Sequence, residues 1–237
     1  QIETYRYYKD LVQAGERPYY NLVLLARDLT GYQNLVELSS RAFTEGFHHK
    51  PRIDLDLLGQ YSNGLIGLST ATGGAAAHFL HNRDVARATG AAKELEAIFG
   101  RGNFFLEISD HGLDDDPELI KRVVGLSRST DIPIVAGNNA HYLIEEDAKA
   151  HAIMQCIGEG RTLAPGSAHQ GSSKMYVRSR EEMWAIFGDE LPEALNNTLE
   201  IAQACFVDLN LESQDLILPR FPIPADSGCT TPAEYFE

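Results

Sequence analysis

Short apolar runs alternate with amphipathic helical patterns along most of this chain. Two runs, 104–108 and 132–136, each lead through polar residues to a histidine, and a helical pattern with Asp116 as its cap and Pro117 at its first position lies between them. This order predicts a strand–helix–strand unit. Side chains that carry chemistry project from the carboxyl ends of parallel strands, so we expect His111 and His141 to reach the same rim of the sheet.

Further strands and helices are predicted on both sides of this unit. The run 20–26 is nearly continuously apolar, as expected for a strand covered on both faces, and 64–69 is another strand. Because strands and helices alternate, the pattern predicts a parallel α/β sheet that is closed or nearly closed into a barrel. Helical spacing, caps and terminal glycines predict helices over 1–14, 32–43, 55–61, 85–99, 116–127, 145–156, 179–187 and 191–205.

The last part of the chain has a different character. Helical periodicity fades beyond Asp208, and three prolines between 219 and 224 predict an extended linker, with a helix start from Thr231. We therefore expect a domain over 1–210 and, over 211–237, a linker with the start of a further region. The first helix begins without an evident cap, so we also expect that residues precede it in the native protein.

Composition and charge narrow the classes of function. The formal net charge is −14. This charge opposes sequence-independent binding to nucleic acid, because such binding requires Lys and Arg residues that neutralise phosphates. Three cysteines lie far apart and fit neither a disulfide framework nor a zinc knuckle, which favours a reducing cytoplasm. No apolar run approaches the roughly 18 residues of a membrane span, so no membrane partner is expected.

The candidate chemistry lies at the ends of the predicted strands. His111 and His141 could bind a metal ion or a phosphate, or each could simply close a strand in a loop. Gly73 and Gly74 stand at a strand-to-helix junction where backbone amides can approach an anion, although tight helix–sheet packing explains them equally well. The adjacent histidines at 48–49 would point in different directions, which favours a solvated loop.

Six segments of the chain carry a family resemblance, namely 20–35, 45–54, 105–112, 138–143, 192–198 and 218–224. In the same order, they closely resemble the amino-terminal region of bacterial DNA polymerase III alpha subunits, which is a PHP (polymerase and histidinol phosphatase) domain. The resemblance runs from about Tyr19 to the end of the chain. It implies a distorted (βα)7 barrel, here incomplete at its amino terminus, whose Pro-rich extension leads toward the palm of a C-family polymerase.

The resemblance also implies a metal site that has lost ligands. His111 and His141 match ligand positions of the family, where imidazoles and carboxylates bind Zn²⁺ or Mn²⁺ for phosphoester hydrolysis. Ala75 stands where a glutamate is usual and Asn139 where an aspartate is usual, and the early His-x-His segment is absent. Since two negative charges are lost, we expect a vestigial site without a metal cluster. Zn²⁺ or Mn²⁺ would be the cofactor of an active site, and Mg²⁺ that of the parent polymerase.

Three functions are compatible with these residues. The first is a non-catalytic scaffold of a DNA replication polymerase, whose implied partners are the rest of the alpha subunit, a proofreading exonuclease subunit and other replisome components. The second is an active metal-dependent phosphoesterase or 3′–5′ proofreading nuclease, and the third is a free-standing sugar- or histidinol-phosphate phosphatase. Nucleotidyltransferase activity is expected outside residues 1–237, because the nearest aspartate pair, Asp54 and Asp56, lies in a loop and a helix start rather than after a strand.

Overall fold

A computed structural model describes residues 19–48, 50–160, 162, 173–209, 222–224, 227–228 and 230–236. The predicted helix over 1–14 lies outside these residues. Backbone contacts divide the chain into two compact units, Gln1–Val207 and Asp208–Glu237. The first unit carries the sheet and the residues that the sequence singled out.

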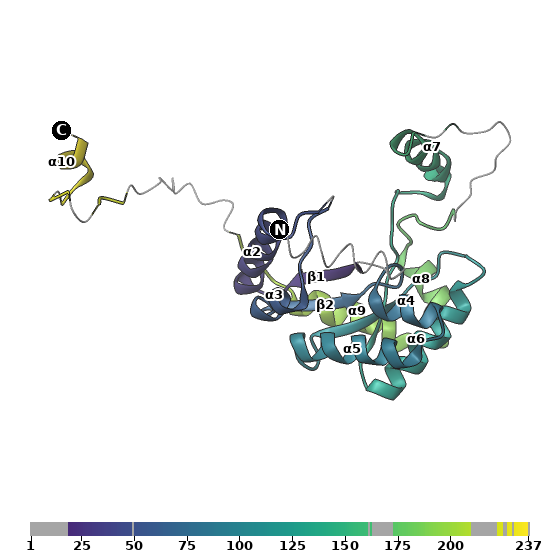
Figure 1. The fold of residues 1–237 in the computed structure, drawn as a ribbon. Coiled ribbons are helices and arrows are strands. Elements are labelled where there is room, and N and C mark those ends of the chain that lie inside the picture. Colours follow the sequence, from purple (N-terminus) through teal and green to yellow (C-terminus); the bar gives the residue numbers. More distant parts are fainter. Residues whose placement is uncertain are drawn as a thin grey trace. The chain divides into compact units, whose positions relative to one another are not determined.

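A four-stranded sheet with the order β1-β2-β3-β4 forms the centre of the first unit (Figure 1). Its last three strands are parallel, as predicted, and lie side by side in chain order. The predicted strands are confirmed with small changes at their ends. They are β1 (Leu22–Ala26), β2 (Leu65–Ser69), β3 (Phe104–Ile108) and β4 (Ile134–Ala136).

The prediction of a wholly parallel sheet is wrong at β1. This strand runs antiparallel to β2, with Ala26 beside Leu65 and Leu22 beside Ser69. The chain between β1 and β2 forms two helices, α2 (Leu29–Thr44) and α3 (Leu55–Gln60). It re-enters the sheet at the end where β1 finishes. Strand β1 is only partly covered on its two faces: Leu22, Leu24 and Ala26 pack against one apolar layer and Leu25 against the other, whereas Val23 is exposed.

Side chains alternate across the parallel strands and fill two apolar layers. One layer packs against α4 (Ala75–His81), α5 (Val85–Phe99) and α6 (Asp116–Thr130) and includes Phe104, Leu106 and Ile134. The other joins Ile66, Phe105 and Val135 to Ile201 of α9 (Pro192–Ala204). Helices therefore cover both faces of the sheet, which is why β2 to β4 read as continuous apolar runs.

The remaining helices follow the sequence pattern closely. The capping box at Ser179 is confirmed: its hydroxyl accepts a hydrogen bond from Glu182 N, and the Glu182 carboxylate accepts one from Ser179 N. The cap of α6 is Asp115 rather than the predicted Asp116, because Asp116 turns its carboxylate to the preceding loop. The region predicted as a helix over 145–156 begins as a 3₁₀ turn. These elements are η1 (Glu145–Asp147), α7 (Ala148–Gly158) and α8 (Arg180–Phe187).

The second unit contains the predicted carboxyl-terminal helix. Helix α10 (Pro232–Phe236) begins next to Thr231, and the Glu234 carboxylate accepts hydrogen bonds from the backbone N–H groups of Thr230 and Thr231 at 2.8 and 3.1 Å. Most of the Pro-rich stretch lies outside the described residues. Within the described part of the chain, no helix is long and apolar enough to cross a membrane.

The structure thus has a mixed α/β fold, with helices on both faces of its sheet. A closed seven-stranded barrel stays a prediction.

Candidate functional site

The loops that follow β2, β3 and β4 lie at the same edge of the sheet, because these strands are parallel. This edge is the one formed by the carboxyl ends of the strands. The loop after β2 leads to Ala75, the loop after β3 carries His111, and the loop after β4 carries Asn139 and His141. Both predicted histidines therefore belong to the same edge of the sheet.

His111 is fully buried in a loop that a carboxylate holds in place. Asp116 Oδ2 accepts hydrogen bonds from His111 N at 2.7 Å and from Leu113 N at 3.0 Å. Burial lowers the pKa of the His111 imidazole, and the neighbouring Arg178 cation lowers it further, whereas Asp116 raises it. The net effect favours the neutral imidazole.

Glu107 is a site residue that the sequence analysis missed. It lies in β3, and its Oε2 accepts a hydrogen bond from Ala71 N, 3.2 Å away in the loop after β2. On the other side its carboxyl group fills the space beside Gly137, where an added Cβ would lie only 1.8 Å from Glu107 Oε1. Burial raises the pKa of the Glu107 carboxyl. The available signal was a single acid inside the apolar strand Phe104–Ile108.

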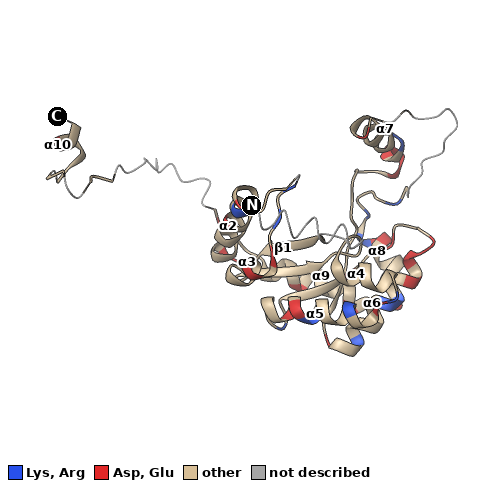
Figure 2. Cartoon of the chain, in the orientation of Figure 1, with Lys and Arg blue, Asp and Glu red and all other residues tan. Residues whose placement is uncertain are grey.

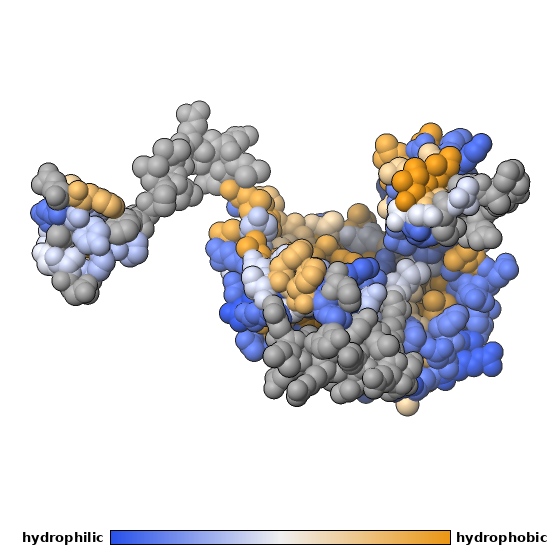
Figure 3. All heavy atoms as spheres, turned by 45° about the horizontal axis from the view of Figure 1, so that its top comes forward, coloured by the Kyte–Doolittle hydropathy of each residue, from blue (hydrophilic) through white to orange (hydrophobic). Residues whose placement is uncertain are grey.

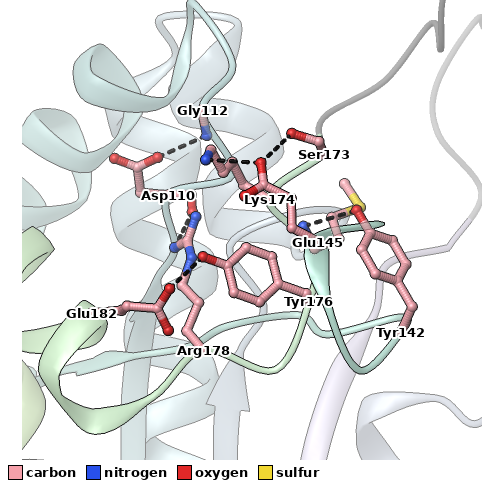
Figure 4. A network of polar contacts seen from close by, with 10 residues as sticks. Asp110, Gly112, Tyr142, Glu145, Ser173, Lys174, Tyr176, Arg178 and Glu182 are labelled. Atoms are coloured by element: carbon pink, nitrogen blue, oxygen red, sulfur yellow. Dashed lines mark hydrogen bonds and ion pairs between the residues drawn. The ribbon is translucent and has the colours of Figure 1, made fainter. Parts of the chain in front are cut away.

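A polar network links the loop after β3 to the segment before α8 (Figure 4). Arg178 Nη1 donates to the carbonyl oxygen of Asp110 at 2.6 Å, and Asp110 Oδ1 accepts from Gly112 N at 2.7 Å. The Tyr176 hydroxyl donates to Glu182 Oε1 at 2.6 Å, a bond that raises the pKa of Tyr176 and lowers the pKa of Glu182. Arg178 thereby brings a positive charge to the edge of the sheet where His111 lies.

The same segment also holds the loop after β4. His141 N donates to Met175 O at 2.8 Å, and Asn138 Nδ2 donates to Tyr176 O at 2.8 Å. The His141 ring lies 5.3 Å from the ring of His151 on α7, measured between centroids. His141 is exposed, unlike His111. Contacts with residues 34 and 38 positions later in the chain therefore hold this loop.

The two positions where the family pattern has carboxylates carry none. Ala75 is the first residue of α4 and lines a cavity of about 680 Å³, together with Ser69 and Phe79. Asn139 is exposed and adopts a positive φ of 43°. Neither side chain can supply negative charge to a metal ion.

The carboxylates of the nearby acids already accept hydrogen bonds from the backbone of their own loop. Asp110 and Asp116 accept hydrogen bonds from the N–H groups of residues 111–113. In the part of the chain that the structure describes, no three His, Cys, Asp or Glu residues converge on a point that could hold a metal ion. The donors at this edge therefore do not fit the metal cluster that the family pattern implies.

The other motifs have local structural roles. Gly74 packs so tightly that an added Cβ would lie 2.5 Å from Thr70 O, which favours the packing explanation for the two glycines. His48 is half-buried and its backbone N–H bonds to Lys50 O, while His49 lies outside the described residues. Asp54 caps α3 by accepting from Leu57 N at 2.8 Å.

Comparison with known proteins gives a consistent result. Residues 3–111 match the PHP domain family. DNA polymerase III alpha subunits of Treponema pallidum, Borreliella burgdorferi and Thermus aquaticus are 36%, 37% and 39% identical to this chain over 209, 219 and 214 residues. These alignments cover 88%, 92% and 87% of the chain but only 18%, 19% and 17% of the relatives, so the chain spans about a fifth of their length. Residues 3–111 are therefore similar to the PHP domain family, and the chain is similar to the corresponding stretch of DNA polymerase III alpha subunits.

Proposed function

We propose that this chain acts as the PHP region of a bacterial DNA polymerase III alpha subunit, and that it supports DNA replication in the cytoplasm as a non-catalytic scaffold. Residues 1–210 would be the PHP-like domain, and 211–237 would lead into the polymerase region. The rest of the alpha subunit is the first partner that this role requires. A proofreading exonuclease subunit and other replisome components are further partners that the scaffold would serve.

The chemistry of the sheet edge supports the scaffold role. A divalent ion usually needs three or more protein ligands, and anionic ones offset its charge. Ala75 and Asn139 supply no charge, and Asp116 already serves His111 N and Leu113 N. Arg178 adds a cation near His111, which opposes a second positive charge there. The arrangement favours a hydrogen-bonded structural edge.

A metal-dependent phosphoesterase is the second candidate, and Glu107 is the observation that favours it. This half-buried carboxyl group reaches from β3 to the loop after β2 and to Gly137 after β4. It therefore adds one oxygen donor at the edge that carries both histidines. Burial raises the pKa of this carboxyl group, so a metal ion would compete more strongly with a proton for it than at an ordinary carboxylate.

Metal content and phosphodiesterase activity of the full chain decide between the candidates. The purified chain, dialysed against Zn²⁺ or Mn²⁺, would be analysed by mass spectrometry of metals and assayed on bis(p-nitrophenyl) phosphate. The scaffold proposal expects less than stoichiometric metal and no hydrolysis above background. Stoichiometric metal that is lost in the Glu107→Gln variant, together with hydrolysis, would establish the phosphoesterase instead. The double variant Ala75→Glu, Asn139→Asp tests whether the lost carboxylates raise metal affinity.

A further inference from the structure

The turn that leads from α3 into β2 contains an asparagine followed by a glycine, Asn63 and Gly64. Leu65 N donates a hydrogen bond to Ser62 O at 3.1 Å and closes the turn around these two residues. Gly64 has a positive φ of 72°, a conformation that tight turns reserve mainly for glycine. Asn63 is exposed, whereas Leu65, the first residue of β2, is buried. Asn63 therefore lies at the solvent-exposed entrance to a core strand.

The fold requires a glycine at position 64. An added Cβ there would lie 2.6 Å from Asp28 Oδ1 and 2.6 Å from Gly31 N, and the positive φ disfavours every residue with a side chain. A side chain on the residue after an asparagine hinders the approach of the backbone nitrogen of that residue to the asparagine amide carbon. Glycine removes this hindrance, so the packing that requires Gly64 also exposes Asn63 to attack by Gly64 N.

The two groups that would react are not held by hydrogen bonds. The main-chain oxygen of Asn63 accepts a hydrogen bond from Asn34 Nδ2 at 2.8 Å. Within the part of the chain that the structure describes, neither the Asn63 carboxamide nor Gly64 N–H forms a hydrogen bond. Water is the other reactant, and hydrophilic side chains cover much of the surface of the first unit in Figure 3. The asparagine amide can therefore turn toward Gly64 N without breaking a contact.

We infer that Asn63 is a site of spontaneous deamidation in the folded protein. Gly64 N gives up its proton and attacks Asn63 Cγ, a C–N bond forms, and the side-chain nitrogen leaves as ammonia with that proton. The product is a cyclic imide. Water then opens the ring at Cγ, which gives an aspartate, or at the main-chain carbonyl, which gives an isoaspartate whose side-chain carbon has become part of the main chain. Asparagine is one of the chemically labile residues of proteins, and the reaction consumes water alone.

The isoaspartate product would disrupt the contact between the turn and the start of α2. Gly64 O accepts a hydrogen bond from Arg27 N at 2.8 Å, and an added Cβ at Gly31 would lie 1.9 Å from the same oxygen. A main chain that is this closely packed cannot gain a methylene group without moving. Both products also add a negative charge in the residue next to Gly64, against which the Asp28 carboxylate packs. Deamidation should therefore weaken the pairing of β1 with the first residue of β2.

Peptide mapping by mass spectrometry tests the site. The folded chain would be incubated at mildly alkaline pH and sampled over time for conversion of Asn63 and of Asn139. Asn139 is the internal control, because it is also exposed but precedes Ala140, whose side chain hinders the attack. We expect Asn63 to convert several-fold faster than Asn139, with isoaspartate among its products. Equal rates at the two positions, or conversion of Asn63 only after unfolding in urea, would overturn the inference.

Two variants test the effect on the fold. Asn63→Gln keeps an amide whose ring closure is slower, so its thermal midpoint should stay constant during the incubation while that of the wild type falls with the converted fraction. Asn63→Asp carries the new charge on a main chain of normal length and should lose less in midpoint than the converted wild type. A wild type that converts fully and keeps its midpoint would overturn the predicted damage. Equal losses for Asn63→Asp and the converted wild type would overturn the part assigned to the isoaspartate.

Discussion

Glu107 has a half-buried carboxyl group that accepts a hydrogen bond from the backbone N–H of Ala71. Burial raises the pKa of the Glu107 carboxyl above the ordinary 4.5. The contribution of the protonated carboxyl to stability is therefore fully present below pH 4.5, and it is lost as the pH rises through the pKa of the folded state. Glu107→Gln keeps an acceptor for Ala71 N and removes the ionisation. We expect the variant to melt at a higher temperature than the wild type at pH 7.

Thermal unfolding at several pH values checks this prediction. The gain in midpoint should be about 2–4 °C for each kcal/mol of destabilisation removed in a chain of this size. It should shrink toward zero as the pH falls to 4.5, where the unfolded carboxyl also begins to hold its proton. A gain that persists unchanged at low pH would mean that ionisation of Glu107 is not its cause.

Asp116 determines the conformation of the loop that carries His111. It is buried, and its carboxylate serves two backbone donors, His111 N and Leu113 N. Asp116→Ala should lower the free energy of unfolding by roughly 1–3 kcal/mol for each donor left buried without an acceptor. Asp115→Ala is the matched control, because Asp115 is exposed and its side chain makes no capping bond. Urea titrations that give equal losses for the two variants would contradict this role.

At the scale of elements, the local sequence was sufficient to predict a helix or strand wherever a cap or a hydrophobic period marked it. The Ser179 capping box and the helical spacing of 85–99 gave α8 and α5 with correct ends. The orientation of β1 could not be predicted, because parallel and antiparallel pairing depend on where α2 and α3 return the chain. The residues of β1 carry no signal for the direction in which the strand runs.

A close helix–sheet contact at Gly31 illustrates such a long-range constraint. An added Cβ at Gly31 of α2 would lie 1.9 Å from the carbonyl oxygen of Gly64, just before β2. We expect Gly31→Ala to destabilise the fold by roughly 1–3 kcal/mol, because a backbone atom cannot move aside like a flexible side chain. The return of the chain from α3 to the sheet would have to shift.

Gly90→Ala in α5 serves as the matched control for Gly31→Ala. Gly90 is exposed, and an added Cβ there meets nothing within 4 Å. Alanine should raise the free energy of unfolding by about 0.5–1 kcal/mol, since glycine is the poorer helix former. Thermal midpoints that move in the same direction for both variants would show that the Gly31 contact is not the determining factor.

At the scale of the molecule, the candidate site could be predicted only where it follows from strand order. The parallel unit of β3, α6 and β4 placed His111 and His141 at one edge without knowledge of any contact. Arg178 and Glu107 could not be found in this way. Arg178 donates a hydrogen bond to Asp110, which lies 68 positions earlier in the sequence. Glu107 is a single acidic residue in an otherwise apolar strand, a pattern that does not indicate a site.

Net charge leads to a prediction for the whole chain, namely that it binds DNA weakly. The chain carries 34 acidic against 20 basic residues, and Figure 2 shows both signs interspersed on α5 and α6. Several cations are already paired with acids, as Arg41 is with Glu37 and Lys174 with Glu145. Non-specific binding requires several Lys or Arg residues to replace condensed counterions on the phosphates, and it strengthens steeply as salt is removed.

Fluorescence anisotropy with labelled single-stranded and duplex DNA, at salt concentrations from about 50 to 200 mM, measures this affinity. We expect no submicromolar binding in that range and only a shallow dependence on salt, since few phosphates would be neutralised. A variant with Glu145→Gln frees Lys174 from its ion pair and should increase binding only slightly, because one added cation releases about one counterion. Submicromolar, strongly salt-dependent binding by the unmodified chain would instead place a DNA contact within residues 1–237. It would contradict the proposed scaffold role, which includes no DNA contact in this part of the protein.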